Sequence, residues 1–141
     1  MPRLITAHSN PLIKDVRLLR EKRHRREAGR FLAEGLRILT EALDAGHVPH
    51  ILIFAADSGG HPLVARLIAA TEAAGGEAIE TSRDILHKLS GKDNPQAVLG
   101  VYSDLRISLD ALDRSAAPIW LVAQALRDPG NLGTMLRTGD A

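Results

Sequence analysis

The sequence predicts an α/β domain with a mostly parallel or mixed sheet that helices cover on both faces. The main observation is that short apolar runs alternate with segments of helical apolar spacing up to about residue 103, which is typical of strands joined by helices. The composition agrees, because 45% of the 141 residues are hydrophobic and only 3% are aromatic. Such a balance is typical of a folded chain with an aliphatic core.

The first expected element is a basic amphipathic helix that stops at Gly29. Ser9 and Asn10 both fit its N-cap, and Pro11 fits the first helical position, where a missing N–H costs nothing. Lysine and arginine occupy most of the helix surface. The apolar face is formed at helical spacing by Leu12, Ile13, Val16 and Leu19.

Strands and helices then alternate. Residues 30–47 begin with a short extended piece and continue as a helix that ends at Gly46. A later helix starts at the N-cap Ser82 and stops at Gly91. The other expected elements are strands at 50–55, 77–81 and 96–103 and a helix at 61–76 that buries Leu63, Leu67, Ala70 and Ala74.

The C-terminal part is expected to begin a second domain. A connection rich in small and acidic residues leads to Pro118, and the apolar run 119–126 is a candidate buried strand. In the loop that follows, Pro129 and Gly130 form a turn and Asn131 caps a helix. The buried stripe of that helix is expected at Leu132, Met135 and Leu136, with Arg137 at its edge.

The charge is unevenly distributed. Residues 1–30, which we call the basic arm, carry nine Lys or Arg and three acidic residues, in a chain whose net charge is only +1. Four of these cations, Lys22, Arg23, Arg25 and Arg26, lie within five residues. A basic segment on an acidic body favours contact with nucleic-acid backbone, whereas the plainer interpretation is a solvated helix face. Scarce aromatic residues argue against base stacking.

Several classes of protein are disfavoured. The chain has no cysteine and six scattered histidines, so we expect neither a disulfide framework nor a metal site. No apolar run approaches the ~20 residues of a membrane helix, and no signal peptide is visible. We therefore expect a cytoplasmic protein that binds no membrane.

The segment from Asp128 to Arg137 is the second candidate site. A loop between a strand and a helix start is where open α/β sheets bind anions, although neither a Walker loop nor a G-x-G-x-x-G motif is present. A plain turn and helix cap is the structural alternative. A small anionic ligand at the Asn131 loop is a further possibility.

The two ends of the chain together resemble a known family. The stretch "NLGTMLR" at 131–137, led by "DPG" and continued by "TGDA", resembles the N-x-G-x-x-x-R motif of the SpoU (TrmH-like) RNA ribose 2′-O-methyltransferases. The N-terminal "SNPLIKDVRLLREKRHRREAGRFLAEGLRIL" is similar to the substrate-binding domain of that family. The resemblance implies methyl transfer from S-adenosylmethionine to a ribose 2′-hydroxyl of rRNA or tRNA.

The resemblance also implies domains and site residues. Residues 1–105 are expected to form an L30e-like α/β/α RNA-binding domain, 106–117 a linker, and 118–141 the first strand and helix start of a knotted α/β (SPOUT) methyltransferase domain. Asn131 would shape the catalytic site, and Arg137 would contact the target phosphate and help to activate the 2′-hydroxyl. The implied RNA contacts are Asn10, Lys14, Arg17, Lys22, Arg25, Arg26 and Arg37.

The later motifs of the family are not found in this sequence. In the family they form the cofactor pocket and much of a homodimer interface, so the chain is expected to be an incomplete part of a longer enzyme. By itself it would bind no S-adenosylmethionine and have no activity. The competing hypothesis is a non-enzymatic L30e-like RNA-binding module, which shares every feature of residues 1–105.

Overall fold

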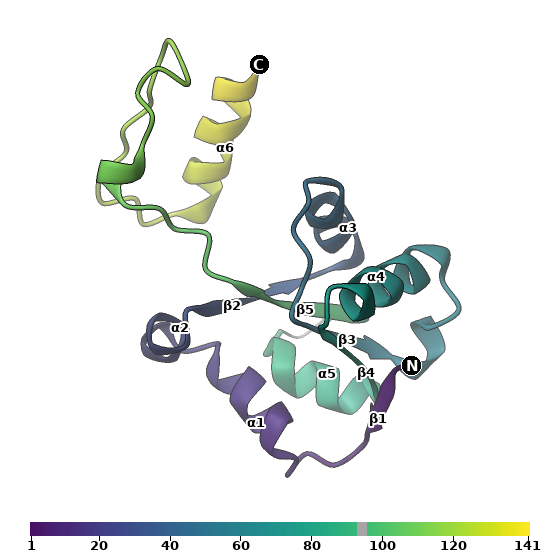
Figure 1. Cartoon of the computed structure of the whole chain (residues 1–141). Coiled ribbons are helices and arrows are strands. Elements are labelled where there is room, and N and C mark those ends of the chain that lie inside the picture. Colours follow the sequence, from purple (N-terminus) through teal and green to yellow (C-terminus); the bar gives the residue numbers. More distant parts are fainter. Residues whose placement is uncertain (93–95) are drawn as a thin grey trace. The chain divides into compact units, whose positions relative to one another are not determined.

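The computed structural model of the chain describes residues 1–92 and 96–141. Its internal contacts divide the chain into two units, Met1–Leu105 and Arg106–Ala141. The first unit contains a five-stranded sheet with helices on both faces, and the second contains an irregular segment and one longer helix (Figure 1).

The sheet of the first unit is mixed, which agrees with the sequence prediction. Its spatial order is β1-β4-β3-β5-β2. The first three strands in this order run parallel, whereas β5 is antiparallel to both of its neighbours. The strands are β1 (Arg3–Ile5), β2 (Arg30–Glu34), β3 (Ile51–Ala55), β4 (Glu77–Thr81) and β5 (Val98–Ser103).

Two helices cover each face of the sheet (Figure 1). On one face, α1 (Pro11–Leu18) and α5 (Arg83–Ser90) bury their apolar residues in a shared cluster. On the other, α3 (Leu36–Asp44) and α4 (Pro62–Ala73) form a second cluster. Successive side chains of a strand point to opposite faces. Accordingly, β3 contributes Ile53 and Ala55 to the first cluster and Leu52 and Phe54 to the second.

The expected helix over the basic arm is in fact two helices. Asn10 caps α1 by accepting a hydrogen bond from the Leu12 N–H, but α1 ends at Leu18 and α2 (Lys22–Ala28) follows after a turn. The prediction of one helix was wrong because the apolar stripe ends at Leu19, which is buried, while α2 buries no residue. Helices in proteins are stabilised mainly by packing of an apolar face.

Strand β1 was not predicted. Three residues are too few to show an alternating pattern. The strand forms because it pairs with β4 at the edge of the sheet, where the buried hydroxyl of Thr81 also donates a hydrogen bond to the Ile5 carbonyl oxygen at 2.6 Å.

The buried stripe of α4 differs from the predicted one by about one residue. Val64, Leu67 and Thr71 are fully buried, whereas Leu63 is 38% exposed. Thr71 tolerates burial because its hydroxyl donates a hydrogen bond to the Leu67 carbonyl oxygen at 2.7 Å. Packing against the sheet therefore buries a face of α4 that is shifted by about one residue from the predicted apolar face.

The second unit lacks the strand that we expected at 119–126. No residue of this run is in a strand, and Ile119 and Val122 are 85% and 89% exposed. A strand needs a hydrogen-bonding partner, and within the described part of the chain this run pairs with no strand. The unit also contains α6 (Pro129–Asp140). Across the described residues, no helix is long and apolar enough to cross a membrane.

Candidate functional site

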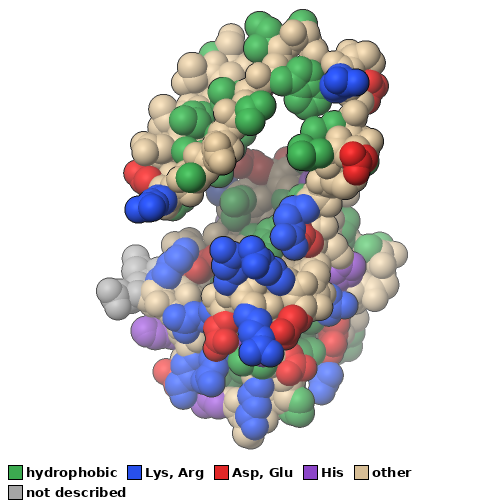
Figure 2. All heavy atoms as spheres, turned by 90° about the vertical axis from the view of Figure 1, so that its left-hand side faces the viewer, with side chains coloured by type: hydrophobic (Ala, Val, Ile, Leu, Met, Phe, Trp, Pro, Cys, Tyr) green, Lys and Arg blue, Asp and Glu red, His purple; other side chains and the backbone are tan. Residues whose placement is uncertain are grey.

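Four of the seven expected RNA contacts form an exposed set of cations on α1 and α2. Lys14, Arg17, Lys22 and Arg26 are all exposed, and among the described residues they have no acidic partner. Figure 2 shows Lys and Arg side chains interleaved with acidic side chains on the face that carries these helices. The free cations are therefore available to contact an anion.

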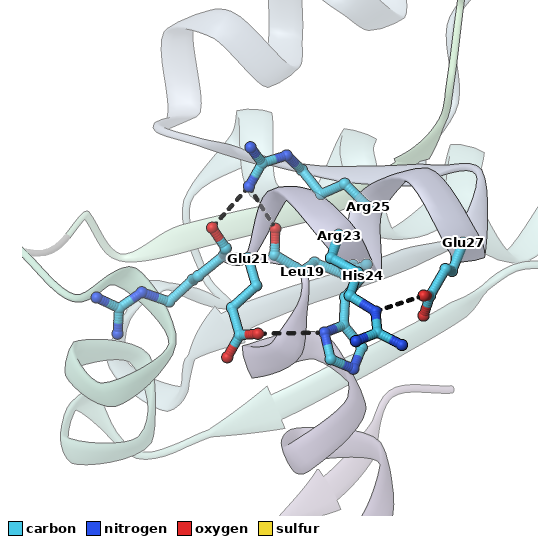
Figure 3. A network of polar contacts seen from close by, with 7 residues as sticks. Leu19, Glu21, Arg23, His24, Arg25 and Glu27 are labelled. Carbon is cyan, nitrogen blue, oxygen red and sulfur yellow. Dashed lines mark hydrogen bonds and ion pairs between the residues drawn. The ribbon is translucent and has the colours of Figure 1, made fainter.

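Arg23, another cation of α2, does have an acidic partner. Arg23 pairs with Glu27 at 2.7 Å, and the His24 Nδ1 lies 3.3 Å from the Glu21 carboxylate (Figure 3). The Arg23–Glu27 ion pair has i,i+4 spacing within α2, where it stabilises the helix modestly.

Arg25 has a structural role. Its Nη1 donates hydrogen bonds to the carbonyl oxygens of Leu19 at 3.0 Å and Arg20 at 2.6 Å, so the side chain points back to the turn after α1 (Figure 3). Carbonyl groups at a helix end lack intrahelical partners, and a guanidinium satisfies them well. Arg25 therefore stabilises the turn between α1 and α2.

The remaining two expected contacts are also engaged within the protein. The Asn10 side chain caps α1. Arg37 is on α3 and pairs with Glu41 at 2.8 Å, and α3 covers the opposite face of the sheet from α1. The fold thus separates Arg37 from the cations of α1 and α2.

Sequence reasoning did not find the cations that α5 adds to those of α1. The two helices pack side by side, and their ends form a concavity that we call the α1–α5 concavity. A helix-periodicity argument places Lys88 on the exposed face of α5 but gives no information on its neighbours. The concavity is lined by Arg17, Arg20, His87, Lys88, Gly91 and Lys92.

Glu34 of β2 contacts three residues between the end of α5 and the start of β5. Its carboxylate accepts hydrogen bonds from the Gln96 N–H at 2.9 Å and the Ser90 hydroxyl at 2.8 Å, and Lys92 lies 2.9 Å away. Burial raises the pKa of this carboxyl, but these hydrogen bonds and the Lys92 charge outweigh burial and hold the pKa below its ordinary value. The side chain is therefore a charged anchor for Lys92.

The C-terminal motif lies on α6. Asp128, rather than Asn131, is the N-cap, because its side chain accepts a hydrogen bond from the Gly130 N–H at 2.8 Å. The expected cap at Asn131 was wrong because Pro129 takes the first helical position, which places the cap directly before it. Arg137 is exposed and its guanidinium donates to the Thr134 hydroxyl at 3.3 Å.

The expected apolar stripe of this helix is not buried. Leu132, Met135 and Leu136 are 43%, 36% and 63% exposed. Every residue from 118 to 141 except Gly133 is exposed. Among the described residues, no group of three His, Asp or Glu side chains is placed to hold a metal ion.

Comparison with known proteins decides the family. A family model described as the MRM3-like substrate binding domain matches residues 10–100. The chain belongs to this family. The match confirms the resemblance to the substrate-binding domain of SpoU-like RNA methyltransferases and includes the whole of α1 to α5.

Relatives of this substrate-binding domain are RNA methyltransferases by name. An uncharacterized tRNA/rRNA methyltransferase of Synechocystis is 33% identical over 97% of this chain and 48% of its own length. The 23S rRNA (guanosine(2553)-2′-O)-methyltransferase RlmP of Bacillus subtilis is 30% identical over 97% of this chain and 50% of its own. The chain therefore spans about half the length of these relatives.

Solved structures show the same fold. The AdoMet-bound rRNA methyltransferase from Sinorhizobium meliloti matches 98% of this chain and 50% of its own chain, with a TM-score of 0.76 and 34% identity. A second structure, an RNA 2′-O ribose methyltransferase, matches 97% of this chain and 51% of its own with a TM-score of 0.72 and 34% identity.

Proposed function

We propose that this chain is the RNA-binding part of an enzyme that transfers a methyl group from S-adenosylmethionine to a ribose 2′-hydroxyl of rRNA or tRNA. The family match over residues 10–100 is the observation that carries the proposal. The unpaired cations of α1 and α2 support it, because sequence-independent affinity for RNA comes largely from phosphate contacts.

The domain organisation follows the same proposal. Met1–Leu105 is the RNA-binding domain, of the L30e type, and 106–117 is the linker. Residues 118–141 begin a knotted methyltransferase domain, which acts as a homodimer in the longer protein. Support comes from the division of internal contacts after Leu105 and from relatives about twice as long as this chain.

In that enzyme, Arg137 contacts the phosphate of the target nucleotide and helps to activate the 2′-hydroxyl, while Asn131 shapes the site. A guanidinium stays charged and is a poor general base by itself. A phosphate oxygen that it binds in bidentate fashion supplies the missing acceptor for the hydroxyl proton. Arg137 then orients the phosphate and stabilises the charge.

The experiment for RNA binding is a salt titration of the 141-residue chain with a fluorescently labelled RNA stem-loop. We expect the logarithm of the affinity to fall linearly with the logarithm of the salt concentration. Replacing Lys14, Lys22 and Arg26 together by Gln should weaken binding and flatten the slope by roughly 0.7–0.9 for each phosphate that the protein no longer neutralises.

A matched control replaces Arg3, Arg66 and Arg114 by Gln, which changes the net charge equally but leaves α1 and α2 intact. Arg3 and Arg66 lose only exposed ion pairs, which contribute little to stability. Equal effects of the two triple variants would place the RNA elsewhere, and salt-insensitive binding by the unaltered chain would contradict the proposal.

The alternative is a non-enzymatic RNA-binding module. A methyl-transfer assay separates the two, with a longer protein that contains this chain, labelled S-adenosylmethionine and RNA from the same cell. Incorporation of label at ribose supports the enzyme. No transfer to any RNA, in the presence of salt-sensitive RNA binding, supports the module.

A further inference from the structure

We propose that the α1–α5 concavity is a phosphate-binding site that holds the RNA backbone, in addition to the cations exposed along α1 and α2. This inference rests on the proposed function. The concavity brings together four Lys or Arg side chains and one His, and none of the described residues that line it is acidic. Two of the cations come from α1 and the turn after it, and the others come from residues about 70 positions later in the sequence.

Three of these cations are free to bind an anion. Arg17, Arg20 and Lys88 are exposed and, within the described residues, none of them has an acidic partner. Lys92 differs, since the Glu34 carboxylate holds it at 2.9 Å. The site thus has unneutralised positive charge and one cation whose position is fixed.

The arrangement is held by the hydrophobic core. Val16 and Leu19 at the end of α1 and Ile85 and Leu89 of α5 are buried in the same apolar cluster. Because this packing holds the backbones of Arg17 on α1 and Lys88 on α5 near each other, the like charges of their side chains repel one another. A bound anion lowers that repulsion, which makes the site favourable for phosphate.

Arg20 lies near the end of α5. Its Nη1 lies 3.5 Å from the Lys88 carbonyl oxygen, and a Cβ on residue 91 would overlap its guanidinium. Gly91 also has a φ of +63°, the left-handed conformation that favours glycine at a helix end. One glycine therefore ends α5 and leaves room for the arginine.

Phosphate of RNA fits this site better than a small enclosed ligand. The concavity has a volume of about 400 Å³ and its cations are exposed to solvent, as expected for backbone contact. Arg17 lies one helical turn from Lys14 on α1. An RNA strand bound along α1 can thus pass from the exposed cations into the concavity.

The test is the variant Lys88→Glu, with Arg114→Glu as its control. Both residues are exposed and unpaired among the described residues, and both substitutions change the net charge by the same amount. Binding of the labelled RNA stem-loop should weaken about tenfold at 0.1 M salt in Lys88→Glu, with a salt slope lower by ~0.7–0.9. Arg114→Glu should bind normally, and Lys88→Arg should keep the affinity of the unaltered chain.

The outcomes are distinct. If Lys88→Glu binds RNA as tightly as Arg114→Glu and its urea unfolding is unchanged, the proposed site is overturned. The proposed function of the chain then still stands. Loss of stability without loss of RNA affinity would mean that Lys88 only stabilises the end of α5, which also overturns the site.

Sodium tripolyphosphate serves as a probe for free phosphate. If Lys88→Glu weakens only tripolyphosphate binding, the site binds free phosphate and the assignment to RNA is overturned. Absence of RNA binding by the unaltered chain would instead refute the proposed function.

Discussion

The guanidinium of Arg25 donates a hydrogen bond to the backbone carbonyl oxygen of Arg20 at 2.6 Å. The same Nη1 also reaches the Leu19 carbonyl oxygen, so one side chain of α2 satisfies two carbonyls in the turn after α1. Arg25 and Arg26 are adjacent cations in the sequence, yet the structure gives them different roles. Arg25 stabilises the turn, whereas Arg26 is exposed and free among the described residues.

We expect Arg25→Ala to lower the free energy of unfolding by about 1–2 kcal/mol, because two carbonyls lose a charged donor. Arg26→Ala should change it by less than about 0.5 kcal/mol, as is usual for an exposed side chain. Urea unfolding followed by circular dichroism measures both values. Equal stability of the two variants would contradict the structural role of Arg25.

Glu34→Gln should lower the free energy of unfolding at pH 7 by about 1–2 kcal/mol, since Lys92 loses its charged partner. The pKa of Glu34 lies below its ordinary value of 4.5 in the folded chain. The contribution of Glu34 to the free energy of unfolding is therefore fully present above its pKa in the unfolded chain. It is lost as the pH falls through its pKa in the folded chain.

The difference between wild type and Glu34→Gln should consequently shrink as the pH falls below about 4.5. Urea unfolding at pH 7 and at acidic pH measures it. Glu80→Gln is the control, because Glu80 has no ion-pair partner among the described residues. A difference that stays constant across this range would show that the charge of Glu34 does not matter.

Tyr102→Phe should leave the free energy of unfolding unchanged or raise it by up to about 1 kcal/mol. The Tyr102 hydroxyl is buried without a hydrogen-bond partner among the described residues, and removing an unsatisfied polar group lowers the cost of burial. The ring itself stacks on Phe31, with ring centroids 5.8 Å apart, and this contact is kept in the variant.

Burial of the Tyr102 hydroxyl also predicts that the protein loses stability at alkaline pH. Burial raises the pKa of Tyr102 from 10.0 to about 12, so the wild type should lose stability as the pH rises from about 10 to about 12, when the unfolded chain ionises first. Tyr102→Phe should lose less over this range. Equal losses in urea unfolding at the two pH values would contradict burial of the hydroxyl.

Arg137→Ala, made in a longer protein that contains this chain, should lower kcat at least about hundredfold, the usual cost of removing a group that stabilises transition-state charge. Affinity for S-adenosylmethionine should change little, because the proposed contact of Arg137 is with the RNA phosphate. The unfolding midpoint should also change little, because Arg137 is exposed and its hydrogen bond to Thr134 is long. Single-turnover methyl transfer measures the effect, with Arg114→Ala as the control. A loss confined to the unfolding midpoint would refute a catalytic role.

Much of the first unit was predictable because its signals are local. Ser82 is the N-cap of α5 and Gly91 is its C-cap, as the sequence predicted. The predicted apolar strands are β3, β4 and β5. The break between α1 and α2 was not predicted, because it depends on tertiary packing: α1 buries an apolar face, whereas α2 buries no residue. The run 119–126 looked like a strand from its composition, but hydrophobicity alone supplies no hydrogen-bonding partner.

The sequence alone determined the mixed α/β architecture, the concentration of cations in residues 1–30 and the resemblance to an RNA methyltransferase, because periodicity, charge and short motifs are properties of neighbouring residues. Only the tertiary structure decided which cations are free and which support the fold, and it alone placed Lys88 beside Arg17. Packing of α1 against α5 brings those two residues together across about 70 positions of chain. Contacts of that kind depend on how helices pack on a sheet, which no local pattern encodes.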